Sequence, residues 1–257
     1  MKGLFVLLWI APTVALAASA FDGTWKTRAD SFQVSGTPNA YEISQGLYRC
    51  TSCVPQINVK VDGTDQGVTG HDYYDTVAIR IIDNNSVERT SKKGGKIVST
   101  TAATVSADGK TLIEEWVDYT GAQPAKGTTT SRRLTAGPAG SHALTGTWQQ
   151  DSFNGGSDSL LTVKYQSTPD GLKMEWNGQS YDAKFDGKEY LTKNDPGNTM
   201  VSLKRIDANT IEETDRRNGK VTDIIRITVS ADGKSLSVVD TDPVRNIKMT
   251  WTMMKQP

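Results

Sequence analysis

The side chains best suited to chemistry are two cysteines, Cys50 and Cys53, which are separated by two residues. A redox-active pair with this spacing needs a helix N-terminus in a βαβ unit, but Pro55 and the strand-like run 57–61 follow here. A zinc site needs four ligands, and His71 is the one plausible nitrogen donor nearby. The sequence therefore favours a local disulfide over free thiols, and we expect neither a metal site nor a cofactor.

Nucleophilic or acid–base catalysis has little support in the sequence. A Ser-His-Asp arrangement would have to use one of two histidines, of which His71 lies in a polar stretch and His142 in a Gly/Pro-rich one. Glu88 and Glu212 alternate with their neighbours in a way that is typical of a solvated strand face with cross-strand ion pairs. No catalytic residue is predicted.

The chain begins with a segment that is typical of an export signal. Lys2 precedes a short apolar run, and small residues lead up to Ala18-Ser19-Ala20, a pattern that predicts cleavage near Ala20, with Ala17 as the alternative. The apolar run is too short to span a bilayer as a permanent helix. We expect residues 1–20 to be a signal peptide, the protein to be periplasmic or secreted, and the mature chain to have no transmembrane segment.

The charge balance bears on the partners. The chain has 29 basic and 29 acidic residues and a formal net charge of zero, with no long basic run. Nucleic-acid binding normally requires a basic patch or stripe. We expect no nucleic-acid partner, and the sequence names no protein partner.

An internal repeat organises the rest of the chain. Residues 76–112 match residues 200–236 at a constant offset of 124, with 16 of 37 positions identical, a register that chance does not give. Between the copies lies a small, uncharged, Gly/Pro-rich segment that is typical of a linker. The predicted organisation is a signal peptide followed by copy 1 over 21–134, a linker over 135–143 and copy 2 over 144–257.

Within each copy, short β-favouring runs alternate with turn dipeptides. Asn177-Gly178, Asn218-Gly219 and Asp232-Gly233 supply the positive φ that tight hairpins need. Strands at this spacing, without helical patterns between them, predict an all-β fold of two tandem antiparallel β-meander domains. Such a domain must cover its sheet edges, and an up-and-down barrel is favoured over the alternative of a β-sandwich.

Each copy opens on a Gly-x-Trp motif, Gly23-Thr24-Trp25 and Gly146-Thr147-Trp148. The motif resembles the first strand of the calycins, the superfamily of lipocalins and fatty-acid-binding proteins. The resemblance implies that Trp25 and Trp148 each close one end of a β-barrel near a basic residue of the last strand. Candidates for that residue are Arg132 or Arg133 in copy 1 and Lys248 or Lys255 in copy 2. The lipocalin Thr-Asp-Tyr motif and a helical lid are missing, and the whole chain is also similar to uncharacterised exported bacterial proteins.

Two equivalent strands contain the candidate ligand contacts. Val77 and Ile79 in copy 1 match Val201 and Leu203 in copy 2 on one apolar face, and Arg205 falls on the same face. An inward Arg can bind a ligand carboxylate, whereas an Arg at a strand end more often reaches water along its aliphatic stem.

The resemblance thus implies a non-enzymatic binding protein for a small hydrophobic or amphipathic ligand, although a fold alone does not fix a function. One alternative is a structural or interaction module of the cell envelope with solid barrels. An enzyme with unrecognised chemistry is the third hypothesis.

Overall fold

The computed structural model describes residues 19–257. The expected signal peptide, residues 1–20, lies almost entirely outside the described residues. Within the described part of the chain, no helix is long and apolar enough to cross a membrane.

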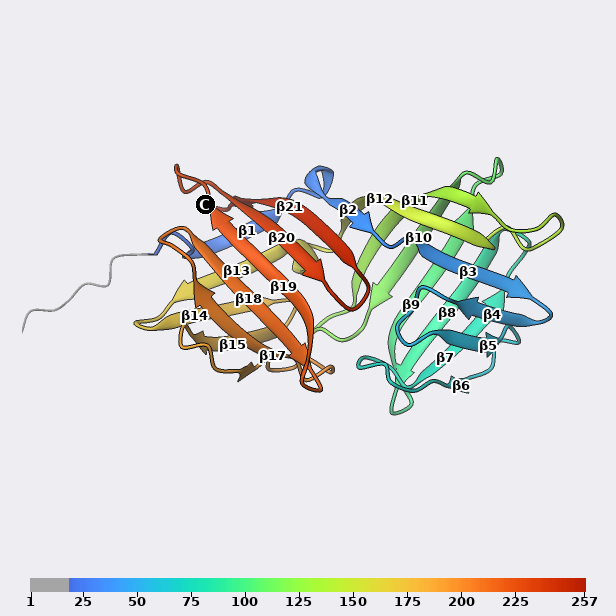
Figure 1. Cartoon of the computed structure of the whole chain (residues 1–257), viewed down its shortest axis with the longest axis horizontal. Helices are drawn as coiled ribbons and strands as arrows, with labels where there is room; N and C mark the ends of the chain where they lie inside the picture. Colours follow the sequence, from blue (N-terminus) through green and yellow to red (C-terminus); the bar gives the residue numbers. More distant parts are fainter. Residues whose placement is uncertain (1–18) are drawn as a thin grey trace, which may run out of the picture.

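The chain forms two antiparallel sheets, each curled into a nearly closed barrel (Figure 1). The prediction of an all-β fold with two barrel-like meanders is confirmed. Barrel 1 contains, in spatial order, β5 (Ile57–Lys60), β4 (Leu47–Cys50), β3 (Asn39–Ser44), β12 (Gly146–Gly156), β11 (Ala125–Ala136), β10 (Thr111–Asp118), β9 (Lys96–Val105), β8 (Ser86–Lys93), β7 (Thr76–Ile81) and β6 (Gln66–Gly67).

Barrel 2 is built in the same way from the second half of the chain and from its N-terminal end. Its order is β15 (Gln179–Lys184), β14 (Gly171–Trp176), β13 (Thr162–Ser167), β1 (Gly23–Thr27), β21 (Ile247–Lys255), β20 (Ser235–Asp242), β19 (Lys220–Val229), β18 (Thr210–Arg217), β17 (Met200–Arg205) and β16 (Tyr190–Leu191), with β2 (Gln33–Gly36) also beside β21. The described residues also contain two short helices, η1 (Ala29–Ser31) and α1 (Asp158–Leu161).

The first strand of each repeat lies in the barrel that the other repeat builds. β1 pairs with β13 and β21, so that Trp25 lies opposite Lys255. β12 pairs with β11 and β3, so that Trp148 lies opposite Arg133. The domain boundaries expected from the repeat therefore need correcting: 21–134 and 144–257 are sequence repeats with exchanged opening strands, and the expected linker 135–143 forms the end of β11 and the turn into β12 of the same sheet.

The exchange has a physical reason that lies in the repeat itself. Both opening strands carry Gly-Thr-Trp, so either strand offers the same side chains to either barrel. The short connection over residues 137–145 makes β11 and β12 neighbours, and consecutive strands usually pair. β12 thereby takes the first-strand place in barrel 1, and β1 takes the equivalent place between β13 and β21.

Each exchanged tryptophan is fully buried in the core of the barrel that it joins. Trp25 belongs to the core of barrel 2 and Trp148 to the core of barrel 1. Burying an indole of about 150–250 Å² at about 25 cal/mol per Å² contributes roughly 4–6 kcal/mol. The guanidinium carbon of Arg133 lies 4.0 Å from the ring centroid of Trp148, and Lys255 Nζ lies 5.2 Å from that of Trp25. These two residues, among the four expected, occupy the basic position beside the tryptophan.

The backbone explains why glycine precedes each of these tryptophans. Gly23 and Gly146 have φ values of +135° and +136°, which residues with a Cβ rarely adopt. A Cβ on Gly146 would lie 2.2 Å from the carbonyl oxygen of Thr135, and a Cβ on Gly23 would lie 2.8 Å from Lys255 Cε. The positive φ thus favours glycine in both barrels, and close packing against the backbone of Thr135 is a second reason at Gly146.

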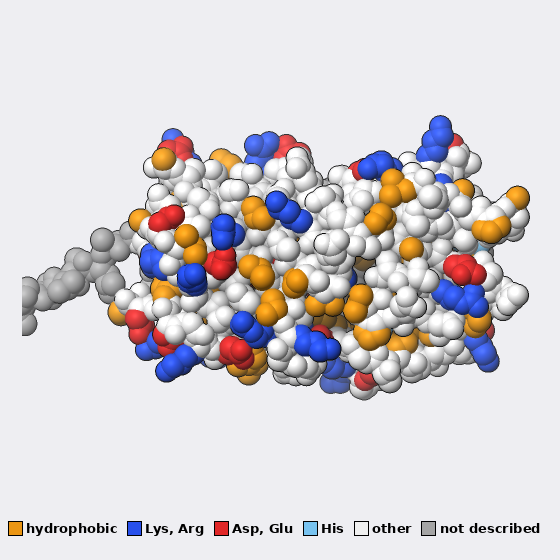
Figure 2. All heavy atoms as spheres, in the orientation of Figure 1, with side chains coloured by type: hydrophobic (Ala, Val, Ile, Leu, Met, Phe, Trp, Pro, Cys, Tyr) orange, Lys and Arg blue, Asp and Glu red, His pale blue; other side chains and the backbone are white. Residues whose placement is uncertain are grey.

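The ends of the two barrels that are not closed by tryptophan face each other. The C-terminus lies at the end of barrel 2 that is remote from barrel 1 (Figure 1), where Trp25 pairs with Lys255. At the junction, Lys93 Nζ donates hydrogen bonds to the backbone oxygens of Asp72 and Pro196, which are equivalent residues of the two repeats. Several hydrophobic side chains gather near this junction in Figure 2, and charges of both signs are spread over the same face.

Candidate functional site

Barrel 2 contains a cavity of about 360 Å³ at the end that faces barrel 1. This volume lies at the lower end of the range of small-molecule sites, about 300–1,000 Å³. The wall is largely apolar and rich in aromatic rings, which come from Phe32, Tyr73, Phe153, Tyr165, Trp176 and Trp251. A pocket of this composition suits an apolar or amphipathic molecule.

Part of the cavity wall comes from the other barrel. Tyr73, in the loop before β7, lines the cavity, and its ring centroid lies 4.9 Å from the guanidinium carbon of Arg217. Gly197 packs so closely against this ring that a Cβ there would lie 2.9 Å from Tyr73 Cζ. Asn218 Nδ2 donates a hydrogen bond to Asp72 Oδ1 at 2.8 Å. The loop of copy 1 is thus fastened over the mouth of barrel 2.

Two carboxyl groups enter the cavity from β18. Glu213 is only 6% exposed, and its Oε2 accepts a hydrogen bond from the Tyr181 hydroxyl at 2.6 Å. Asp215 Oδ1 is buried without a hydrogen-bond partner. Burial raises the pKa of Glu213, and burial together with the charges of Glu213 and Asp223 raises the pKa of Asp215 to about 9. The raised pKa favours the protonated form of Asp215 at neutral pH.

Three further carboxyl groups lie on the adjacent strands at the same end of the barrel. Asp223 Oδ2 on β19 lies 3.4 Å from Arg217 Nη2, and Asp242 on β20 forms an ion pair with Arg245. Asp240, between them on β20, is 7% exposed and its Oδ1 lacks a hydrogen-bond partner. Burial, reinforced by the charges of Asp223 and Asp242, raises the pKa of Asp240 to about 7. This end of barrel 2 is thus richer in carboxyl groups than in cations.

Barrel 1 is almost filled, with a residual cavity of about 50 Å³. Its sequence carries Arg89 at the position equivalent to Glu213 and Trp116 at the position equivalent to Asp240. Trp116 packs directly on Gly127, where a Cβ would lie 2.2 Å from the indole ring. Arg89 lines the small cavity of barrel 1, and its longer side chain takes up space that the shorter Glu213 leaves open in barrel 2.

The structure places the four predicted apolar contacts inside the barrels. Val77, Ile79, Val201 and Leu203 are each at most 1% exposed. Val201 lines the large cavity of barrel 2, and Ile79 lines the small cavity of barrel 1. Val77 and Leu203 belong to the packed cores rather than to a cavity wall.

Arg205 lies outside the cavity, in contrast to the expectation that it faces a ligand. It is the last residue of β17, is exposed, and its guanidinium carbon lies 4.3 Å from the ring centroid of Phe185. The inward alternation ends with Leu203, because the strand reaches the rim of the barrel. The aliphatic stem carries the charge to water, which was the alternative that the sequence left open.

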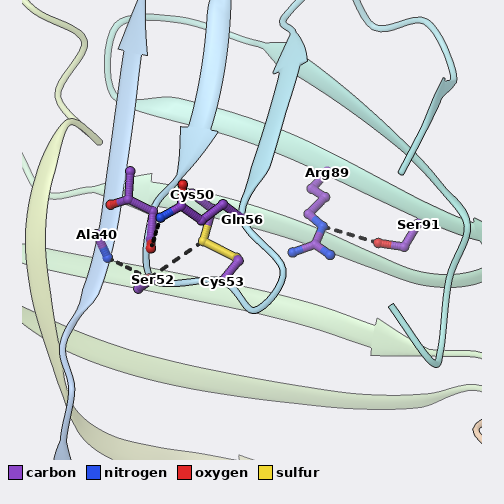
Figure 3. The surroundings of a disulfide bond; sticks show 8 residues. Ala40, Cys50, Ser52, Cys53, Gln56, Arg89 and Ser91 are labelled. Atoms are coloured by element: carbon purple, nitrogen blue, oxygen red, sulfur yellow. Dashed lines mark hydrogen bonds between the residues drawn. A yellow bond between two sulfur atoms is a disulfide. The ribbon is translucent and has the colours of Figure 1, made fainter. Parts of the chain in front are cut away.

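The two cysteines form the expected disulfide between Cys50 and Cys53 (Figure 3). Ser52, within the small loop that the disulfide closes, accepts a hydrogen bond from the backbone nitrogen of Ala40 at 2.9 Å. Figure 3 also shows Arg89 inside barrel 1, where its Nε donates to Ser91 Oγ at 3.2 Å. The disulfide thus anchors the segment between β4 and β5 and lies on the wall of barrel 1.

The histidines take part in local packing. His71 stacks on Tyr74 with 4.6 Å between the ring centroids. His142 Nδ1 accepts a hydrogen bond from the backbone nitrogen of Leu144, and its Nε2 lies 2.8 Å from the backbone oxygen of Asp83. His142 therefore shapes the turn between β11 and β12. Among residues 19–257, no group of three or more His, Cys, Asp and Glu side chains is arranged to hold a metal ion.

The sequence interpretation missed the carboxyl groups of the cavity, although a signal for them exists. Ile211 on β18 is fully buried, so the period-two alternation of a strand turns Glu213 and Asp215 to the same inner face. The sequence interpretation considered only Glu212 of this strand, which lies on the outer face and pairs with Arg226.

Comparison of the chain with protein-family models and with curated proteins gave no match.

Proposed function

We propose that the protein is an exported, non-enzymatic binding protein that holds one small, largely apolar or amphipathic molecule inside barrel 2. The cavity of about 360 Å³ carries this proposal, because empty apolar space is costly in a protein core. The calycin resemblance of the opening strands supports it. The disulfide and the signal-like N-terminus support an oxidising compartment outside the cytoplasm.

Barrel 1 serves in this proposal as a filled partner that covers the mouth of barrel 2. The alternative of an interaction module with solid barrels has one observation in its favour, which is the residual volume of only about 50 Å³ in barrel 1. The two proposals differ in whether barrel 2 takes up a ligand.

Binding of the uncharged fluorescent probe N-phenyl-1-naphthylamine to the full mature chain tests the proposal. Ile225 lines the cavity, whereas Ile224 on the same strand points outward and is 37% exposed. Ile225→Trp should fill the space and weaken probe binding at least tenfold, and the matched control Ile224→Trp should bind like the wild type. Circular dichroism checks that both variants are folded, and native mass spectrometry of undenatured protein tests for a retained ligand.

Absence of probe binding to the wild type, together with an unliganded native mass, would reject the binding function and favour the interaction module. Equal binding by the two tryptophan variants would show that the probe lies outside the cavity.

A further inference from the structure

The cavity of barrel 2 has a polar end that is complementary to a cation. Resting on the proposed binding function, we propose that its ligand is an organic ammonium compound, with the cationic head beside Glu213 and Asp215 and the apolar part between the aromatic side chains. Three independent features of the structure support this assignment.

The first feature is the imbalance of charge at the mouth of barrel 2. Five carboxyl groups from β18, β19 and β20 gather there, and Arg217 and Arg245 pair with Asp223 and Asp242, respectively. No ion pair found among residues 19–257 supplies a cation to the other three. Asp240 is more than nine-tenths buried, and one of its oxygens lacks any hydrogen-bond donor. Such a group is costly to bury alone, and an ammonium ion would provide both the charge and the donors.

The second feature is the aromatic lining. Phe153, Trp176 and Trp251 line the same cavity as Glu213. The negative face of an aromatic ring attracts a cation within about 6 Å, and several such rings recognise quaternary ammonium groups in proteins. The aromatic rings therefore favour the same class of head group as the carboxyl groups.

The third feature is the comparison with barrel 1. At the position equivalent to Glu213, barrel 1 has its own cation, Arg89, whose guanidinium carbon lies 4.9 Å from the ring centroid of Tyr74. Tyr41, Tyr48 and Glu114 line the same small cavity as Arg89. A side chain of the protein thus supplies in barrel 1 the cation that a ligand would supply in barrel 2.

Ammonium binding should be coupled to pH, because the pKa values of the carboxyl groups at this end of the barrel are raised. The charged and titratable groups at this end are, from β18 to β20, Glu213, Asp215, Arg217, Asp223, Asp240 and Asp242, followed by Arg245. The others are Tyr165 on β13, Tyr181 on β15, Asp195 before β17, and Tyr73 and Lys93 from copy 1. The pKa is about 9 for Asp215 and about 7 for Asp240. An ammonium ion must displace these protons, so its affinity should rise from pH 6 to pH 9.

The test compares four ligands that share an octyl chain: octylamine, octyltrimethylammonium, octanol and octanoate. Each ligand competes with N-phenyl-1-naphthylamine for the full mature chain at pH 6, 7 and 8. At pH 8 we expect the two ammonium compounds to displace the probe at concentrations at least tenfold below octanol, and octanoate to be weakest. The advantage of the quaternary ammonium compound over octanol should shrink at pH 6.

Substitutions of the carboxyl groups test whether the ammonium preference arises at this end of the cavity. Glu213→Gln and Asp215→Asn should each reduce the preference for the ammonium compounds over octanol about tenfold. Glu212→Gln is the matched control, because Glu212 is the outward neighbour and pairs with Arg226 on the surface, and it should behave like the wild type. The pH series on the wild type needs no variant, so the test stands even if one substitution impairs folding.

Two negative outcomes are distinguishable. If the probe and octanol bind but the ammonium compounds have no advantage, or if octanoate binds best, the cation assignment is overturned and the binding function stands. If neither the probe nor any octyl compound binds, the proposed function fails and this inference falls with it.

Discussion

Replacing Asp215 by Asn should stabilise the protein at neutral pH. The ordinary pKa of this carboxyl is 3.8, and in the folded protein burial and neighbouring carboxylates raise it to about 9. Between these values the unfolded chain is ionised, whereas the folded chain keeps the proton. The folded state therefore binds more protons, so the free energy of unfolding falls as pH rises from about 4 to about 9, by about 1.4 kcal/mol per pH unit for one proton.

The magnitude follows from the pH interval. From pH 5 to pH 7, one retained proton lowers the free energy of unfolding by about 3 kcal/mol. Asn is close in shape to the protonated Asp and has no charged form, so Asp215→Asn should escape this loss. The advantage of the variant over the wild type should grow by about 3 kcal/mol between pH 5 and pH 7. For a chain of this size, each kcal/mol of unfolding free energy shifts Tm by roughly 2–4 °C.

Urea unfolding followed by tryptophan fluorescence, at pH 5 and pH 7, measures this difference. Asp182→Asn is the matched control, because Asp182 lies exposed on the outer face of the same barrel and pairs with Lys173. An advantage of Asp215→Asn that is equal at the two pH values, or smaller at pH 7, would refute the argument that Asp215 is protonated in the folded protein.

Two further predictions concern the chain ends. A protease site inserted at residues 37–38, between β2 and β3, should yield a nicked protein after cleavage. Its N-terminal strand should stay bound to barrel 2 in native gel filtration and separate in urea. Release of that fragment without denaturant would contradict the strand exchange. The intact mass of protein from the native host should correspond to a chain that begins at Phe21 or Ala18, because the small-residue pattern allows both cuts, and a mature protein that retains Met1 would show that no signal peptide is removed.

Much of the fold could be predicted because the repeat and the turn dipeptides are local signals. Asn218-Gly219 and Asp232-Gly233 take the expected positive φ at Asn218, Gly219 and Gly233, and the disulfide needs no partner beyond its own loop. The exchange of opening strands could not be predicted in this way. Two strands that both read Gly-Thr-Trp offer equal pairing surfaces, and only the spatial path of the chain decides between them.

The candidate site was predicted less well. The ligand contacts were inferred from the inward-facing residues of β17, whereas the carboxyl groups of the cavity lie on β18. β17 supplied Val201, which lines the cavity, but also Arg205, which lies at the rim. The groups that give the cavity its chemical character, Glu213 and Asp215, lie on β18, and they become buried only when β18 pairs with its neighbours in barrel 2. Tyr73, from the other repeat, could not be assigned to the cavity without the arrangement of the barrels.

The pairing of the N-terminal strand with the C-terminal strand sets an order of folding. Barrel 1 consists of strands from the continuous stretch 39–156, so it can close as soon as that stretch is available. Barrel 2 needs Trp25 beside Lys255, a contact that spans almost the whole chain and is made late, because distant loop closure is entropically costly. Until the last strand is available, the leading strand can pair with β13 but leaves its other edge open, and the cavity would come into existence only with the final step of folding.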